Sequence, residues 1–174
     1  LYFSAFGSGS GQELYRTDGT PASTALVGDI YPGGNSGAPT GLVSFNGLLY
    51  FSAYSSSSTH QIYRTDGTSG GTVAVGTGWI FDPVVAGDGL FFVNVSGSLS
   101  RIGADGSSAP IGAGITFATK VTVVGSNVYF YGRTATHGLE LWVTDFAGTL
   151  PVQVIDLIPG AGDSLDSNAR YASA

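Results

Sequence analysis

The stretches "ELYRTDGT" at Glu13–Thr20 and "QIYRTDGT" at Gln61–Thr68 are nearly the same octapeptide written twice in one chain. A carboxylate, a guanidinium and hydroxyl groups make the first copy resemble a reactive loop. The Asp-Gly pair of the motif returns at Asp105, however, and a degenerate version occurs at Asp145. The four aspartates are spaced by roughly 40 to 48 residues, so the motif marks an internal repeat rather than one catalytic loop.

A second marker, a short apolar and aromatic strand, keeps step with the first. Its four copies are "LYFSA" at Leu1, "LYFSA" at Leu49, "LFFVN" at Leu90 and "VYFYG" at Val128. Together the markers predict a single repeat domain of four units, about residues 1–47, 48–89, 90–127 and 128–174. We interpret the chain as a piece of a longer protein.

The order of signals within a unit predicts four antiparallel strands. "LVSF" at Leu42–Phe45 meets Asn46-Gly47, the strongest short hairpin signal, and the chain returns as "LLYFSA". We predict the same kind of hairpin around Asp88-Gly89, and one with a longer turn between Val121 and Gly132. The octapeptide strand and a fourth strand such as "STALVGDI" complete the unit.

Units of this length with four strands are typical of β-propeller blades. Strands such as "LLYF" and "VYFY" are apolar on both faces, which suits blades that pack on both sides. We therefore predict an all-β, propeller-like fold of four blades with four antiparallel strands each. A β-solenoid is the main competitor, but its coil is shorter. The chain starts on the second strand of a blade, and "ARYASA" at Ala169–Ala174 stands where a first strand is expected, so pairing of these two strands would close a ring.

Composition narrows the class of protein. Hydrophobic residues make up 43% of the chain, enough for a sizeable core, and charged residues only 10%, against a usual share of about a quarter. The net charge of −6 argues against a nucleic-acid partner, which requires a basic face. The apolar runs are too short for a bilayer, so no membrane insertion is expected. The absence of cysteine, together with scarce lysine, favours a bacterial extracellular or cell-surface protein.

The repeat resembles the bacterial ELWxxDGT repeat family. The resemblance rests on "ELYRTDGT", "QIYRTDGT" and "LELWVTDFAGT", together with "LVGDIYPGGNSGAP" and "NGLLYF". It covers essentially the whole chain, but the third unit, "SLSRIGADGSS", lacks the Glu-Leu-Trp element. The family implies a propeller-like fold in large secreted or surface proteins. It supplies no catalytic residues to transfer.

Most polar residues of the repeat are predicted to serve the fold. An aspartate before glycine accepts backbone hydrogen bonds and holds a turn. The residues of this class are Asp18, Gly19, Asp66, Gly67, Asp105, Gly106 and Asp145. In the fourth unit Phe146-Ala147 separates the aspartate from its glycine, so that turn must be built differently. Glu13 and Glu140 share a repeat position, where pairing with arginine or solvation is expected rather than the converging carboxylate pair of a glycosidase.

Binding is predicted where the repeat is broken. Trp79, Tyr31, Tyr54, His60 and His137 are candidates for a ligand or partner surface, whereas Trp142 occupies a repeat position and is assigned to the core. Oxygen donors in "GAGDSLDSN" predict a calcium site; they are Asp163, Asp166 and Asn168. No other cofactor and no catalytic residue are predicted.

The sequence thus favours a non-enzymatic, extracellular structural or protein-interaction module of a bacterial surface, appendage or larger complex. Its expected partners are other protein subunits or a surface polysaccharide. The alternatives are a carbohydrate-binding propeller, with aromatic side chains stacked on sugar, and an enzyme acting on polysaccharide.

Overall fold

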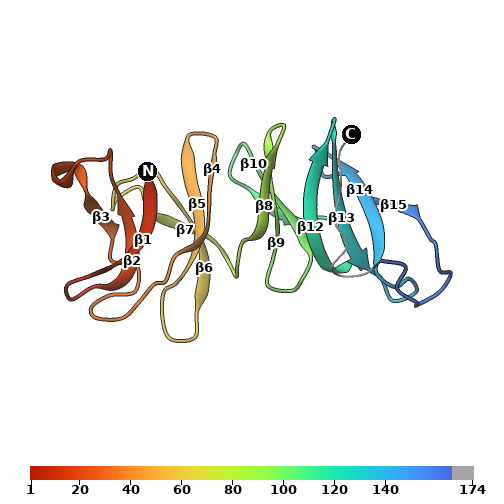
Figure 1. Cartoon of the computed structure of the whole chain (residues 1–174), viewed down its shortest axis with the longest axis horizontal. Coiled ribbons are helices and arrows are strands. Elements are labelled where there is room, and N and C mark those ends of the chain that lie inside the picture. Colours follow the sequence, from red (N-terminus) through yellow and green to blue (C-terminus); the bar gives the residue numbers. More distant parts are fainter. Residues whose placement is uncertain (166–174) are drawn as a thin grey trace. The chain divides into compact units, whose positions relative to one another are not determined.

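A computed structural model describes residues 1–165, and antiparallel strands dominate it (Figure 1). The chain divides into two compact units, Leu1–Ile80 (unit 1) and Phe81–Ala174 (unit 2). The only helical element within the described part is one short 3₁₀ turn, Pro21–Ser23. No helix of residues 1–165 is long and apolar enough to cross a membrane.

Unit 1 contains two antiparallel sheets whose strands follow chain order. The first sheet has three strands and the second has four. The strands of the first sheet are β1 (Tyr2–Gly7), β2 (Gly11–Arg16) and β3 (Ala25–Gly28). Those of the second are β4 (Thr40–Phe45), β5 (Leu48–Tyr54), β6 (His60–Thr65) and β7 (Val73–Thr77).

Unit 2 contains two four-stranded sheets with the same connectivity. The strands of the third sheet are β8 (Phe81–Ala86), β9 (Gly89–Val93), β10 (Leu99–Gly103) and β11 (Ser108–Pro110). Those of the fourth are β12 (Thr116–Val124), β13 (Asn127–Arg133), β14 (Glu140–Asp145) and β15 (Val152–Ile155). A meander of four short antiparallel strands is the architecture of a propeller blade.

The predicted fold class is therefore confirmed. The three strands of the first sheet agree with a chain that starts on the second strand of a blade, because β1 carries the same "LYFSA" sequence as the second strand of the next sheet, β5. The segment Ala169–Ala174, whose pairing would close a ring, lies outside the described residues.

The hairpin turns between the first and second strands of a blade agree with the sequence signal in the second sheet and differ from it in the third. Asn46 and Gly47 both have positive φ, as the predicted turn requires. In the third sheet Ala86 pairs with Gly89, so the turn residues are Gly87 and Asp88 rather than the predicted Asp88-Gly89. Glycine at the first central position, with φ 56°, suits a type II′ turn.

The turn in the fourth sheet is also shorter than predicted. Val124 pairs with Asn127, which leaves the two-residue loop Gly125–Ser126. Gly125 has φ 59° and so takes the first central position of another tight turn.

The first strands of three blades contain a bulge. The pairing register shifts within β4, β8 and β12, where Gly41, Asp82 and Lys120 have φ of 64°, 46° and 54°. Such bulges bend a strand and increase its twist. β12 contains a second shift, with Phe117 at φ 54°, so an aromatic residue here occupies the left-handed region that usually takes glycine.

Each unit has its own apolar core between its two sheets. The cluster in unit 1 includes Leu14, Val27, Leu49, Phe51, Ala53 and Tyr63. The cluster in unit 2 includes Phe91, Leu99, Ile115, Val128, Phe130 and Trp142. Trp142 is therefore a core residue, as its repeat position predicts; its indole N–H donates to the carbonyl of Gly132 at 3.0 Å.

Candidate functional site

The repeated aspartates are engaged in their own turns. In three repeats, Oδ1 accepts hydrogen bonds from the N–H and the hydroxyl of the residue two positions later, at 2.7–3.0 Å. These pairs are Asp18–Thr20, Asp66–Thr68 and Asp105–Ser107. Asp145 instead accepts the N–H of Thr149 at 3.0 Å, because Phe146 and Ala147 lengthen its turn. The hydrogen bonds lower the pKa of all four aspartates, because they favour the ionised form of each carboxyl group.

Glu13 is buried and surrounded by backbone donors. Oε1 accepts the N–H of Gly37 at 2.7 Å and that of Tyr31 at 3.4 Å, while Oε2 accepts the N–H of Ile30 at 3.2 Å. Its exposed fraction is 0%. Burial raises the pKa of Glu13, and the backbone hydrogen bonds offset that effect only in part. The expectation that this carboxylate pairs with arginine or with solvent was wrong: it holds the connection between β3 and β4.

Glu140 occupies the same repeat position in unit 2 and is also buried, so the same expectation was wrong there. Its Oε2 accepts the hydroxyl of Ser164, on the connection that follows β15. The N–H of Leu165 donates to the carbonyl of Leu139 at 3.2 Å and fixes the same connection. In both units, then, this glutamate anchors the connection that leaves the fourth strand.

Three of the five residues predicted for a partner surface meet at one end of the second sheet. The rings of His60 and Trp79 stack with centroids 3.4 Å apart and planes 14° apart. Tyr54 meets both edge-on, at 4.5 Å from His60 and 5.7 Å from Trp79. All three side chains are half-buried. We call this group the aromatic cluster.

The ends of two strands and one tight connection build the aromatic cluster. Tyr54 ends β5 and pairs in register with His60, the first residue of β6. The segment between β7 and β8, residues 78–80, is short and places Trp79 directly over His60. The N–H of Ile80 donates to the buried hydroxyl of Ser52 at 2.7 Å, which fixes the residue after Trp79.

His60 is oriented by the backbone of the same connection. Its Nδ1 lies 3.0 Å from the carbonyl oxygen of Gly78, so this nitrogen carries the proton and donates. Burial lowers the pKa of His60, which favours the neutral ring, and its Nε2 is buried without a hydrogen-bond partner in the described chain.

The second sheet has this cluster where the first sheet has the buried glutamate. Gln61 takes the position of Glu13, and the long connection of residues 29–39 is replaced by the short one of residues 78–80. The missing glutamate and the missing loop thus go together, and the aromatic side chains occupy that end of the sheet.

Tyr31 and His137 are not members of the aromatic cluster. Tyr31 lies on the β3–β4 connection, and within residues 1–165 no ring contact links it to the cluster. His137 belongs to unit 2, where Nδ1 lies 3.2 Å from the hydroxyl of Thr134 and Nε2 lies 3.7 Å from Oδ2 of Asp156. Its contacts are those of a turn residue between β13 and β14.

The predicted calcium ligands do not form an open site in the described part of the chain. Asp163 pairs with Arg133 through Oδ2 and accepts the N–H of Leu139 at 2.7 Å through Oδ1. A guanidinium beside a carboxylate disfavours a cation there. Asp166 and Asn168 lie outside the described residues. Residues 1–165 contain no group of three or more His, Cys, Asp or Glu that could hold a metal ion.

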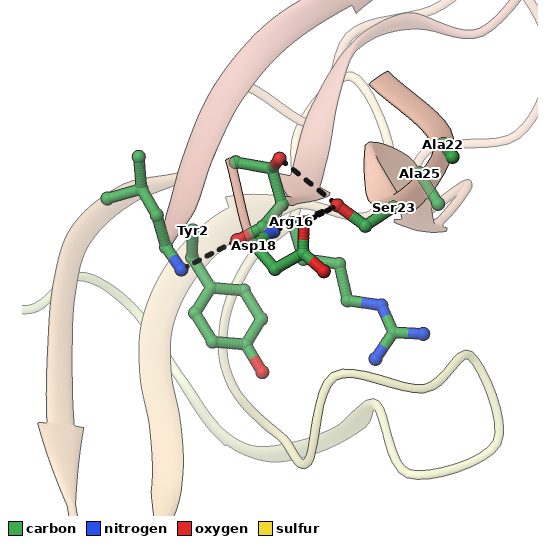
Figure 2. A pocket seen from close by; sticks show the side chains of 8 residues that line it. Tyr2, Arg16, Asp18, Ala22, Ser23 and Ala25 are labelled. Atoms are coloured by element: carbon green, nitrogen blue, oxygen red, sulfur yellow. Dashed lines mark hydrogen bonds between the residues drawn. The ribbon is translucent and has the colours of Figure 1, made fainter. Parts of the chain in front are cut away.

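A pocket of about 460 Å³ opens at the Asp-Gly end of the first sheet (Figure 2). Its lining residues are Leu1, Tyr2, Arg16, Thr17, Asp18, Ala22, Ser23 and Ala25. Asp18 accepts hydrogen bonds from Ser23 and Thr20, and the backbone nitrogen of Leu1 donates to the carbonyl of Thr17 at 2.9 Å. The carboxylate that faces this pocket therefore already accepts hydrogen bonds within its own turn.

Comparison with solved structures supports the propeller-like fold. Puromycin hydrolase matches with a TM-score of 0.56 at 14% identity, and its S511A mutant complexed with PGG matches with 0.55 at 15%. TolB from Acinetobacter baumannii matches with 0.50 at 15% identity. The matches cover 89% of this chain but only 25% of the hydrolase chains and 40% of the TolB chain. No family model and no curated protein matches the sequence.

At 14–15% identity, these similarities identify the class of fold and do not identify a specific relative. The chain is an all-β protein built of propeller blades, and it spans a quarter to two-fifths of the solved chains that it resembles.

Proposed function

We propose that this chain is a non-enzymatic interaction module, part of an extracellular structural protein or larger complex of a bacterial surface, and that the aromatic cluster contacts its partner. The single observation that supports the proposal is the convergence of Tyr54, His60 and Trp79 at one end of a rigid sheet. Loop-built ends of rigid β-folds are common binding surfaces. Tyrosine and tryptophan are the side chains most enriched at the energetic centres of protein interfaces.

The structural roles of the repeated carboxylates support a module without catalysis. The repeated aspartates hold turns, and the two buried glutamates anchor connections, each within its own unit. Turn and connection roles for these carboxylates favour a module without the converging acid–base pair of a glycosidase. An assay for reducing ends released from polysaccharide tests this point, because sustained release by the purified chain contradicts it.

The location at a bacterial surface is supported by the absence of cysteine and by the resemblance to ELWxxDGT repeats. Protease treatment of intact source cells tests it. Cleavage of this chain while cytoplasmic proteins stay intact is the expected result, and full protection contradicts the proposal.

Replacing Trp79 with alanine is expected to weaken partner binding by about tenfold to a hundredfold. The indole contributes a face to the aromatic cluster, and truncation of a central interface tryptophan typically costs about 2 kcal/mol or more. The partner is first identified from a surface-protein fraction by crosslinking through the Ser55–Ser58 loop. The dissociation constant is then measured with the purified partner.

Phe6→Ala is the matched control for this experiment. Phe6 takes in β1 the place that Tyr54 takes in β5, is 78% exposed, and lies outside the aromatic cluster. Its variant is expected to bind like the wild type. If a folded Trp79→Ala variant binds the partner with unchanged affinity, the aromatic cluster is not part of the interface.

A neutral carbohydrate is the second candidate ligand. Its supporting observation is the hydroxyl-rich hairpin loop of residues 55–59, which connects Tyr54 to His60 and carries no charge. Hydroxyl groups beside aromatic rings suit a sugar ring. A glycan array distinguishes the candidates, since saturable binding that is lost in Trp79→Ala favours the sugar and its absence favours a protein.

A further inference from the structure

In unit 1 the second sheet covers one face of the first sheet, and a few repeat positions build the contact. Leu14 and Val27 of the first sheet are 0% and 2% exposed, because they lie in one apolar cluster with side chains of the second sheet. The second sheet contributes Leu49, Phe51, Ala53 and Tyr63. Phe51 and Tyr63 pair across β5 and β6, and their rings stack with centroids 5.5 Å apart. The contact therefore has an aliphatic half on one blade and an aromatic half on the next.

The aromatic half is present again on the first sheet, where it is open. Phe3 pairs with Tyr15 across β1 and β2, and the two rings stack with centroids 6.0 Å apart. Both side chains are only half-buried, whereas the equivalent pair of the second sheet is buried. Leu1 takes the position of Leu49 and is 84% exposed, whereas Leu49 is 6% exposed. We call Leu1, Phe3, Ala5 and Tyr15 the Phe3–Tyr15 face.

The aliphatic half is present again on the fourth sheet. The pairing register shifts after Leu141, which makes Val154 the extra residue of a bulge. In the first sheet the register shifts after Leu14 in the same way, and Val27 is the extra residue. The two blades thus carry the same pair of aliphatic side chains at the same bulge.

The aliphatic side chains of the fourth sheet are open. Neighbouring residues of a strand point to opposite faces, so Leu141 points away from the core in which Trp142 lies. Leu141 is half-buried and Val154 is 47% exposed, although their equivalents in the first sheet are buried. Leu157 is 58% exposed and takes the position of Ile30, which packs against the cluster of unit 1. We call Leu141, Val154 and Leu157 the Leu141–Val154 face.

We propose that the chain associates head to tail with a second copy of itself, and that the Phe3–Tyr15 face of one copy covers the Leu141–Val154 face of the other. A second copy carries the half that this face lacks. Its open aromatic face has the strand pairing and the ring stacking that cover Leu14 and Val27 within unit 1. The contact between the first two sheets is therefore the template for the contact between copies, and removal of apolar side chains from water drives it.

The two faces differ, so the contact is heterologous. Each docked copy leaves one face of each kind open at the ends of the assembly, and association can continue from copy to copy. The proposal goes beyond the proposed function, since neither face includes Tyr54, His60 or Trp79.

The test is sedimentation velocity of the full chain over a wide range of protein concentrations. The weight-average sedimentation coefficient is expected to rise with concentration as copies associate. A coefficient that stays at the monomer value throughout the range overturns the proposal.

Two variants each block one face. Val154→Glu places a carboxylate on the Leu141–Val154 face, and Leu1→Glu places one on the Phe3–Tyr15 face. Both positions are exposed, so the folded chain accommodates the charge, whereas the contact between copies would remove it from water. Each variant alone is expected to raise the dissociation constant at least about tenfold. Val95→Glu, at a residue 64% exposed outside both faces, is the matched control and is expected to associate like the wild type.

Mixing the two variants tests the head-to-tail arrangement. Val154→Glu keeps an intact Phe3–Tyr15 face and Leu1→Glu keeps an intact Leu141–Val154 face, so an equimolar mixture restores one contact. The expected product is a dimer that cannot grow further. Leu157→Glu blocks the same face as Val154→Glu from the connection after β15, and it replaces that variant if circular dichroism shows a loss of fold.

Two results with these variants overturn the proposal. One is association of either single variant at wild-type strength, because another surface then forms the contact. The other is a mixture that remains monomeric, because the two faces then do not complement each other. Neither result bears on Trp79 and its partner, so the two proposals stand or fall separately.

Discussion

Replacing Glu13 with alanine is expected to lower the free energy of unfolding of unit 1 by about 3 to 5 kcal/mol. The carboxylate accepts the N–H groups of Ile30, Tyr31 and Gly37 and is itself fully buried. Its removal leaves these donors without an acceptor and opens a cavity, and both effects destabilise the folded state. Urea unfolding followed by tryptophan fluorescence measures the loss.

Gln12→Ala is the matched control, one position away on β2. Gln12 is half-buried and its amide donates to the hydroxyl of Ser4 at 3.1 Å, so its loss is expected to cost about 1 kcal/mol or less. Equal stability losses in the two variants would show that Glu13 is not the anchor of the β3–β4 connection.

The pH dependence of stability provides a separate test of Glu13. Because burial raises its pKa, the folded state binds this proton more tightly than the unfolded state does. The corresponding stability is fully present below the ordinary carboxyl pKa and is lost as pH rises through the folded-state pKa. Glu13→Gln lacks this contribution, so the advantage of the wild type over it is expected to shrink as the pH rises above the ordinary carboxyl pKa. A constant difference contradicts the pKa direction.

Gly11→Ala is expected to destabilise unit 1 by about 3 kcal/mol. Gly11 has φ 65°, and a Cβ at this position would lie 1.8 Å from the carbonyl oxygen of Asn35. An alanine must therefore displace the β3–β4 connection, which Glu13 holds in place, and adopt an unfavourable backbone conformation. Thermal or urea unfolding measures the effect.

Gly9→Ala, in the same hairpin, separates the two contributions. Gly9 has φ 85°, but nothing lies within 4 Å of a Cβ built there. Its variant experiences only the backbone penalty, about 1 kcal/mol. If Gly11→Ala costs no more than Gly9→Ala, the close approach of Asn35 does not constrain the fold.

The fold could be predicted because its signals are local and repeated. The Asp-Gly octapeptide and the "LYFSA" strand recur at blade period, and Asn46-Gly47 marks a hairpin that the structure contains. The position of a tight turn is less certain from sequence, since "AGDG" offers two glycines. Cross-strand pairing of Ala86 with Gly89 selects Gly87 as the turn residue.

The candidate site could be predicted only in part. Broken repeat positions identified Tyr54, His60 and Trp79, but their mutual stacking depends on the strand register and on the short connection after β7. The buried glutamates were missed because a lone carboxylate in a polar motif usually lies in solvent. A signal was present: Glu13 and Glu140 occur in the units that also carry the Asp-Ile-x-Pro-Gly or Asp-Leu-Ile-Pro-Gly loop.

The exchange of one connection for another has a consequence for protein engineering. In the first sheet a glutamate and a long loop close one end, and in the second sheet a short segment and three aromatic rings do so, on strands that pair in the same order. The first two sheets thus close the same end with different connections on the same order of strands. Grafting Gly78–Ile80 together with the histidine and the tyrosine onto another blade should transfer the aromatic cluster as one unit and leave the hairpin turns of that blade unchanged.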